Sequence, residues 1–188
     1  MRKRPGRKPV FTRRQVIDAA LAEGIGSFTL RAVAERLGVK ATALYRVFSS
    51  RQELQLAAMN AISRDIEPDP RLRTWQEALR DVVNRYWDMC SRYPEAATVI
   101  LTQPEAFGMA LPRIAAIVER LAELGIPAGT DGAAFALDFV VDMTLETYVS
   151  IQPYLTPDAN GRTGLDRLTQ ILGGRPDLFG MQDLGERG

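Results

Sequence analysis

The chain has 188 residues, of which 46% are hydrophobic, so it can form one domain, or a small domain joined to a larger one, around an apolar core. One cysteine and no histidine exclude a disulfide framework and leave no zinc or haem cluster, so we expect no metal and no cofactor. No apolar stretch has the length needed to cross a bilayer, and the basic N-terminus lacks the continuous apolar segment of a secretion signal. We therefore expect a soluble protein of the reducing cytoplasm.

The net charge of +1 is divided unevenly along the chain. Residues 1–51 contain 12 Lys/Arg and 3 Asp/Glu, a net of +9, whereas residues 52–188 contain 12 Lys/Arg and 20 Asp/Glu, a net of −8. A polyanion would therefore bind only the N-terminal part. By itself the basic run over residues 2–8 is typical of a solvated tail, so its interpretation depends on the segment that follows.

Helical periodicity dominates the sequence and predicts an all-α fold, since no segment shows the alternation of a strand. The first helix should begin after Thr12, the N-cap of a capping box that Gln15 closes. We expect Gly24 and Gly26 to end this helix because positive φ is needed there.

Three more helices should complete the N-terminal part. One begins after Thr29 and is about two turns long, and the next spans residues 41–47. Another begins at Ser50, where Glu53 completes a second capping box, and continues to about residue 64.

The two prolines in residues 67–70 must interrupt the helix, so we place a domain boundary there and expect domains at 1–66 and 67–188. In the second domain the pattern predicts helices near residues 74–93, after residue 94, near 112–124 and near 131–152, then a loop at 156–164, a short helix at 165–172 and a partly ordered tail.

Two short helices joined by a tight glycine turn at Gly38 predict a helix-turn-helix, whose second helix enters the major groove of DNA. If Leu44 and Phe48 anchor that second helix in the core, the outward side carries a set suited to bases and phosphates. This set consists of Lys40, Ala41, Thr42, Tyr45 and Arg46. The alternative is an ordinary three-helix core without DNA binding.

The segment from Thr29 to Leu54, TLRAVAERLGVKATALYRVFSSRQEL, resembles the DNA-binding segment of the tetracycline-repressor (TetR) family. The resemblance covers about the first 60 residues. It implies a homodimeric repressor that leaves a palindromic operator when a small molecule occupies a C-terminal pocket. By position it implies phosphate contacts from Thr29 and Arg31, base contacts from Lys40 to Thr42 and Arg46, and a backbone clamp formed by Tyr45 and Arg51. Where this chain has Lys40 the family often has Ser or Thr, and lysine is a poor N-cap.

The residues that precede the first helix offer a further contact. Arg7 and Lys8 lie between Pro5 and Pro9 in a segment that could enter an adjacent minor groove. A disordered solubilising tail is the equally weighted alternative.

The expected helix at 131–152 is apolar on almost every side, which indicates that it is covered from two directions. We therefore expect it to lie between the domain core and a second copy of the chain, and the resemblance implies a four-helix dimer bundle completed by residues 165–172. A buried helix of a monomer is the alternative.

A pocket between the C-terminal helices should be mostly apolar with few polar groups. The candidate ligand-binding residues are Tyr86, Trp87, Phe107, Met109, Phe135, Phe139, Asp142 and Met143, each of which could instead be ordinary core. Asp138, Asp142 and Glu146 recur at every fourth position. They form a solvated stripe, pair with Arg113 and Arg120, or favour a cationic ligand.

The absence of histidine, the lone Cys90 and the lack of a Gly-rich phosphate loop argue against an enzyme. The expected function is a DNA-binding repressor released by a small apolar or aromatic effector. The alternative is a DNA-binding regulator that answers to a protein partner and binds no effector.

Overall fold

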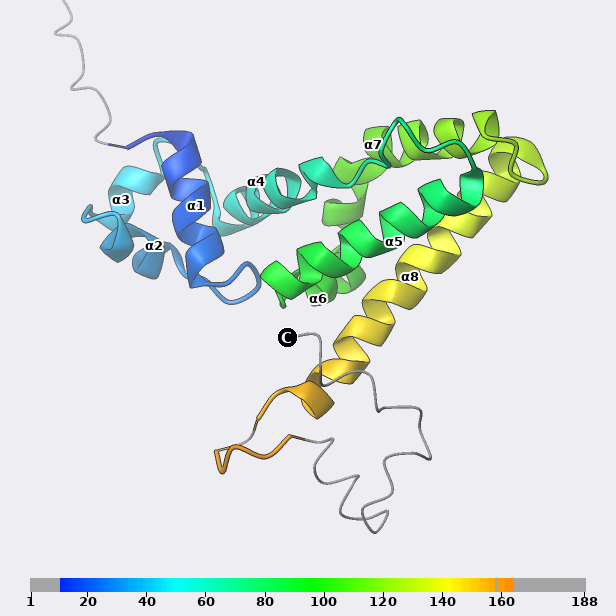
Figure 1. The fold of residues 1–188 in the computed structure, drawn as a ribbon. Coiled ribbons are helices and arrows are strands. Elements are labelled where there is room, and N and C mark those ends of the chain that lie inside the picture. Colours follow the sequence, from blue (N-terminus) through cyan, green and yellow to red (C-terminus); the bar gives the residue numbers. More distant parts are fainter. Residues whose placement is uncertain (1–10, 158, 164–188) are drawn as a thin grey trace, which may run out of the picture. The chain divides into compact units, whose positions relative to one another are not determined.

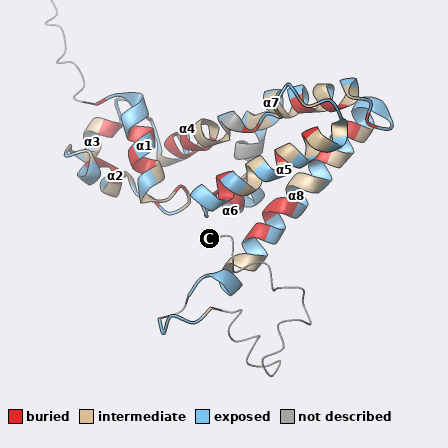
Figure 2. Ribbon diagram, in the orientation of Figure 1, coloured by how far each residue is buried: buried red, intermediate tan, exposed pale blue. Residues whose placement is uncertain are grey.

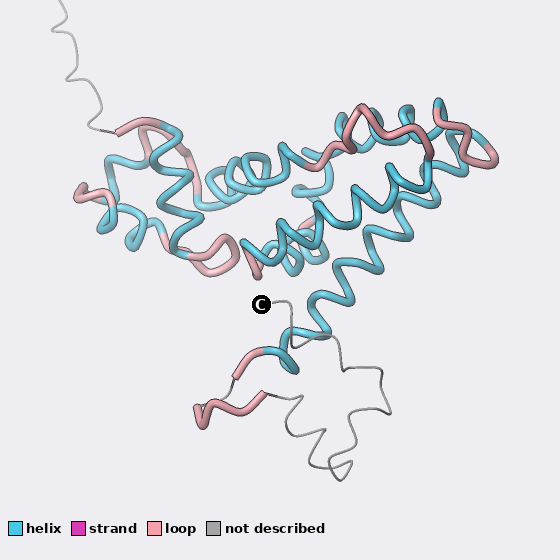
Figure 3. The backbone as a smooth tube through the Cα atoms, in the orientation of Figure 1, coloured by secondary structure: helices cyan, strands magenta, loops and turns pink. Residues whose placement is uncertain are grey.

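The computed structural model describes residues 11–157 and 159–163. This part of the chain is helical and contains no strand, as Figure 3 shows, so the predicted all-α class is confirmed. The chain divides into two compact units, residues 1–146 and 147–188. The boundary expected at residues 66 and 67 remains a prediction.

Four helices form the N-terminal part: α1 (Arg13–Glu23), α2 (Leu30–Arg36), α3 (Ala41–Leu44) and α4 (Arg51–Ile62) (Figure 1). Helix α1 packs against α2 and α4, and α2 packs against α3. The fully buried apolar side chains of this part come from all four helices and the loops between them: Val16, Ile25, Phe28, Val33, Leu44, Phe48 and Leu54 (Figure 2).

The capping box predicted for α1 is present, with Thr12 as N-cap and Gln15 as its partner. Gly24 ends the helix with φ of 102°, as expected. Gly26 does not have positive φ, so that part of the prediction is wrong. Its lack of a side chain serves close approach instead, because a Cβ there would lie 3.2 Å from Cβ of Glu95.

Two boundaries in this part differ from the prediction. Helix α3 ends at Leu44 and only turns follow it to residue 47. Ser50 caps α4, but the Glu53 carboxylate accepts from Ser49 N–H and hydroxyl at 2.7 and 2.8 Å. The second capping box is therefore shifted by one residue. After Ile62 the chain continues as a 3-10 turn at Ser63–Asp65.

Four further helices follow: α5 (Trp75–Arg92), α6 (Ala96–Thr102), α7 (Pro104–Glu123) and α8 (Gly129–Leu155). The predicted start at Pro112 is wrong, because α7 begins at Pro104 and Pro112 lies inside it. Proline is favoured in the first turn, where its missing N–H has no intrahelical acceptor, so Pro104 was the informative signal. The short helix and tail expected after residue 164 lie outside the described residues.

Helix α7 packs against α4, α5 and α6 and is the hub of residues 1–146. Helix α4 contacts α1 at its N-terminal side and also packs on α7, so it joins the first three helices to the rest of this unit (Figure 1). In α8 the side chains of Ala133, Leu137 and Leu145 are buried. None of the helices described is both long and apolar enough to cross a membrane.

Candidate functional site

The turn between α2 and α3 is built from local backbone chemistry. Thr29 caps α2 by accepting from Ala32 N–H at 3.1 Å. Gly38 adopts φ of 66°, which side-chain-bearing residues rarely tolerate. The Val39 N–H then donates to the Ala34 carbonyl at 2.9 Å, which closes the turn. The chain can therefore leave α2 and enter α3 at once, as a helix-turn-helix requires.

Helix α3 and the turn after it expose polar side chains on one side and bury apolar side chains on the other. Leu44 and Phe48 are almost completely buried, whereas Tyr45 is 56% exposed and Thr42 and Arg46 are exposed. Lys40 is also exposed and makes no side-chain cap bond, so its ammonium is available to a partner. Ala41 is half-buried beside it.

Of the other residues predicted to contact DNA, two are exposed near the start of α2 and two lie before the first described residue. Thr29 and Arg31 are exposed, and Arg31 forms an ion pair with Glu35 at 2.8 Å. The hydrogen bond and charge of Glu35 raise the pKa of Arg31, which stays cationic. Arg7 and Lys8 lie outside the described residues.

The side chain of Arg51 contacts the protein itself and does not belong to the exposed side chains around α3. Its guanidinium donates to the carbonyls of Phe28 at 2.8 Å and Gly26 at 2.7 Å, and it lies 4.7 Å from the centre of the Phe28 ring. Gln55, which is buried, donates to the Ile25 carbonyl from the next turn of α4. Arg51 therefore ties α4 to the loop before α2, and the contact with the DNA backbone that the resemblance implied for it remains a prediction.

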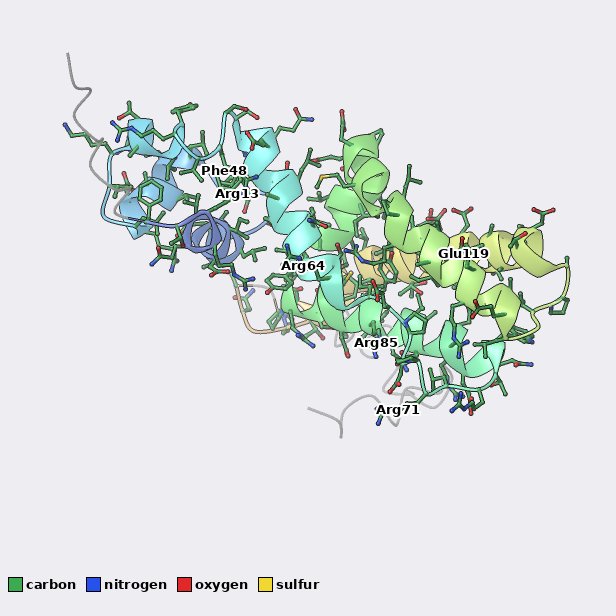
Figure 4. All side chains as sticks on the ribbon, turned by 90° about the horizontal axis from the view of Figure 1, so that it is seen from above. Arg13, Phe48, Arg64, Arg71, Arg85 and Glu119 are labelled. Atoms are coloured by element: carbon green, nitrogen blue, oxygen red, sulfur yellow. The ribbon has the colours of Figure 1, made fainter. Side chains whose placement is uncertain are left out.

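Arg13 supports the recognition helix and was missed by the sequence analysis. It lies 4.0 Å from the centre of the Phe48 ring and donates to the Val47 carbonyl at 2.9 Å (Figure 4). It also reaches Glu53 at 3.4 Å. No local sequence signal marks these contacts, because the chain brings α1 and the end of α3 together only in three dimensions.

A second link joins the helix-turn-helix to the following helices. Glu95, at the N-terminus of α6, accepts from Gly26 N–H at 2.7 Å and Ser27 N–H at 3.2 Å. A Cβ at Gly24 would lie 2.8 Å from a carboxylate oxygen of Glu95. The loop after α1 is thus held by α4 from one side and by Glu95 from another.

A cavity of about 420 Å³ lies among α4, α5, α6, α7 and α8. Four predicted ligand residues line it: Tyr86, Met109, Phe135 and Asp142. Trp87, Phe139 and Met143 are not among its lining residues, and the side chain of Phe107 is not described. Phe139 and Met143 are 56% and 44% exposed.

Polar groups in this cavity are few. Asn60, Ser63, Tyr86, Arg113, Asp138 and Asp142 line it together with apolar side chains. Arg113 donates to the Ser63 hydroxyl at 2.9 Å. Burial raises the pKa of Tyr86 to about 12, so its phenol is a hydrogen-bond donor at neutral pH.

The acidic stripe on α8 has no arginine partner in the described part of the chain. Arg113 bonds to Ser63, and Arg120 bonds to Glu123 and to backbone carbonyls of the preceding linker. Burial, followed by the charges of Asp138 and Glu146, raises the pKa of Asp142. Of the three alternatives for the stripe, pairing with Arg113 and Arg120 is therefore wrong.

Reactive groups outside this cavity are few. Among the described residues no three His, Cys, Asp or Glu side chains are placed to hold a metal ion. Cys90 is fully buried, and burial raises the pKa of its thiol to about 11, so little nucleophilic thiolate is present at neutral pH.

Helices α1 to α3 form a three-helix head that exposes a basic recognition helix. Helix α4 joins this head to helices that enclose a cavity. This arrangement defines a helix-turn-helix transcription regulator. Residues 17–58 match the family described as "Bacterial regulatory proteins, tetR family". Over these residues the match confirms the resemblance found in the sequence.

Solved structures support the same fold over most of the chain. BioQ from Mycobacterium smegmatis is 26% identical, with a TM-score of 0.65 over 87% of this chain and 93% of that one. BioQ with its double-stranded DNA operator is 23% identical, with a TM-score of 0.62 over 87% of this chain and 97% of that one. A variant of TetR from Acinetobacter baumannii AYE in complex with minocycline is 23% identical, with a TM-score of 0.61 over 89% and 98%. No curated protein matches the sequence.

Proposed function

We propose that this regulator is a homodimeric, cytoplasmic repressor that binds a palindromic operator through residues 1–66 and releases it when a small molecule occupies the cavity. The proposal that this protein binds DNA depends on the exposed side chains of α3 and the residues next to it. These are Lys40, Thr42, Tyr45 and Arg46, and the buried side chains of Leu44 and Phe48 hold this segment against the core. Basic and hydroxyl side chains on such a helix suit base edges and phosphates.

The apolar surface of α8 supports the dimer. Phe135, Phe139 and Met143 are 73%, 56% and 44% exposed, and the two phenyl rings stack with centres 6.3 Å apart. Exposed apolar surface of this kind marks association sites, and most soluble oligomers are twofold dimers. Two recognition helices related by a twofold axis would read half-sites about one helical turn apart.

The cavity is the observation that supports control by a small-molecule effector. We propose that α4 transmits the binding of this effector to the DNA-binding helices. Met59, Asn60 and Ser63 at the C-terminal end of α4 line the cavity, while Arg51 at its N-terminal end holds the loop before α2. An effector that binds one orientation of α4 more tightly would shift the population of DNA-competent dimers. The alternative is a protein partner that acts on α4 without a ligand.

Selection of duplexes from a random pool by the purified full chain tests the DNA-binding proposal. We expect enrichment of a palindrome and a footprint that covers both half-sites. Enrichment of an asymmetric site bound by a monomer would contradict the dimer, and no enrichment in dilute buffer would contradict DNA binding itself.

A paired measurement tests the effector. A true effector should raise the melting temperature and lower operator affinity in the same preparation, because it binds one folded state preferentially. Compounds that stabilise the protein yet leave operator affinity unchanged would favour control by a protein partner.

A further inference from the structure

The cavity contains one cationic side chain, that of Arg113 on α7. It is half-buried, and among the described residues its guanidinium makes a single hydrogen bond, the 2.9 Å bond to the Ser63 hydroxyl. No carboxylate in this part of the chain lies within ion-pair distance of it. Arginine carries five N–H donors in a planar fork, so most of its donor capacity is unused by the protein.

A second donor lies near this guanidinium. Tyr86 on α5 lines the same cavity, and the charge of Arg113 acts on its phenol. The phenol makes no hydrogen bond to another described residue and is reached by solvent, since no buried side-chain N or O atom of the described part lacks a partner, and its high pKa keeps it protonated at neutral pH. A ligand that supplies acceptors would replace the water at these two donors as it fills the cavity.

The rest of the lining is suited to a hydrocarbon or aromatic body. Its larger apolar members come from α4, α6, α7 and α8: Met59, Ile100, Met109, Ile114, Ile117, Val118, Phe135, Leu137 and Val141. A volume of about 420 Å³ is within the range of small-molecule sites.

Two carboxylates also line the cavity and decide how a charged ligand would lie. Asp138 and Asp142 on α8 are exposed to water, whereas Arg113 is half-buried. Water screens the two exposed aspartates more strongly than Arg113, so each aspartate contributes a weaker field than the arginine at the α4, α5 and α7 side of the cavity. The aspartates would repel a second negative charge and keep an anionic head on the α4, α5 and α7 side.

We infer that the cavity binds an apolar monocarboxylate, whose carboxylate accepts two hydrogen bonds from the Arg113 guanidinium and one from the Tyr86 hydroxyl. Guanidinium and carboxylate match in this bidentate geometry. This inference rests on the proposed function and names the ligand class of the same cavity.

The inference also names a route to the DNA-binding head. Ser63 is the C-cap residue of α4, and Arg113 is its hydrogen-bond donor. A carboxylate that engages Arg113 competes for the group that holds the C-terminal end of α4, so binding would loosen or reorient that end.

Calorimetric titration of the full chain without DNA tests the ligand class. The probes are 2-naphthoate, 2-naphthol and 2-naphthylmethylamine, which share one aromatic body and differ in the head group. We expect wild type to bind naphthoate at least about tenfold more tightly than either other probe, because hydrogen bonds to a charged group are the strong ones.

Variants test whether Arg113 is the anchor. Arg113→Met should retain the apolar body but lose the preference for naphthoate, and Arg113→Lys should retain part of it, since lysine keeps the charge without the fork. Arg80→Met, an exposed arginine on α5, is the control and should behave as wild type. Circular dichroism and the melting temperature check that each variant folds.

Several results would overturn the inference. Tightest binding of the amine would show a cation site at Asp138 and Asp142. Equal affinities, no binding of any probe up to millimolar concentration, or an unchanged preference in folded Arg113→Met would remove the carboxylate site. Naphthoate binding that leaves operator affinity unchanged would contradict only the effector-release proposal, so the two failures are distinguishable.

Discussion

At the scale of single residues, the recognition surface depends on which side chains of α3 are buried. Leu44 and Phe48 hold the helix against the core, and Arg13 covers Phe48 while it bonds to the Val47 carbonyl. Arg46, between them, is left exposed with its charge available to DNA. The buried members therefore position a residue that contributes nothing to the core.

Replacement of Arg46 by alanine should weaken operator binding by about 1–3 kcal/mol per half-site if it contacts a base, and relax the sequence preference there. Fluorescence anisotropy with operator and mutated duplexes measures both effects. Arg80→Ala, on α5, should leave operator affinity within twofold at the same salt concentration. Equal losses in the two variants would show that only net charge matters.

At the scale of elements, the loop after α1 connects the head to α6. The Glu95 carboxylate accepts two backbone N–H groups of this loop, at 2.7 Å from Gly26 and 3.2 Å from Ser27. Hydrogen bonds to a charged group stabilise a fold more than neutral ones. Glycine at 26 favours this link, because a Cβ there would lie 3.2 Å from Cβ of Glu95 and would push against it.

Glu95→Ala should lower the free energy of unfolding by about 1–2 kcal/mol, since two backbone donors lose their acceptor, and lower the melting temperature by several degrees. Thermal unfolding followed by circular dichroism measures this. Glu119→Ala, an exposed glutamate on α7, is the matched control and should change stability little. An unaltered melting temperature for Glu95→Ala would contradict the link.

Repulsion within the acidic stripe of α8 predicts that removing one of its charges raises the melting temperature. Asp142 is spaced one turn from Asp138 and from Glu146, and like charges at this spacing repel by roughly 0.2–0.5 kcal/mol each. Asp142→Asn should therefore raise the melting temperature at pH 7 by about 1–3 °C. Asp88→Asn on α5, with Arg92 four residues on, should give no gain.

The pH dependence of this gain has a definite sign. Because the pKa of Asp142 is raised from 3.8 in the folded protein, its protonated form favours folding, and that contribution is lost as pH rises through the raised pKa. The advantage of Asp142→Asn should thus be full at pH 7 and shrink as pH falls toward 3.8. A gain that is constant across this window would assign it to another cause.

At the scale of the whole molecule, the separation of charge decides how the protein meets DNA. The first 51 residues carry 12 Lys/Arg and 3 Asp/Glu, and the remaining residues carry an excess of acidic groups. The acidic part would be repelled by the phosphate backbone, so the electrostatic field orients the head toward the duplex.

Operator affinity should fall steeply with salt, by about a thousandfold or more between 50 and 200 mM, because a dimer that neutralises six or more phosphates releases their counterions. Anisotropy titrations at four salt concentrations give the slope. A duplex with one half-site should bind far more weakly than the palindrome at each concentration. A slope near zero would contradict phosphate binding by the basic head.

Much of the N-terminal part could be predicted because its signals are local. Capping at Thr12 and Thr29 and positive φ at Gly38 each depend on residues within a few positions, and the structure has all of them. The helical periodicity of the sequence also predicted that Tyr45 is exposed and Leu44 is buried. Short-range hydrogen bonds and helix periodicity are properties of the chain itself.

Tertiary structure alone decided the contacts that join distant segments. It turned Arg51 inward onto the carbonyls of Gly26 and Phe28, and it brought Glu95 to Gly26 across 69 positions. It also placed Arg113 and Ser63 in one cavity and left Phe139 outside it. Such pairs depend on how helices pack, and packing is set by the shapes of all the side chains together rather than by any local pattern.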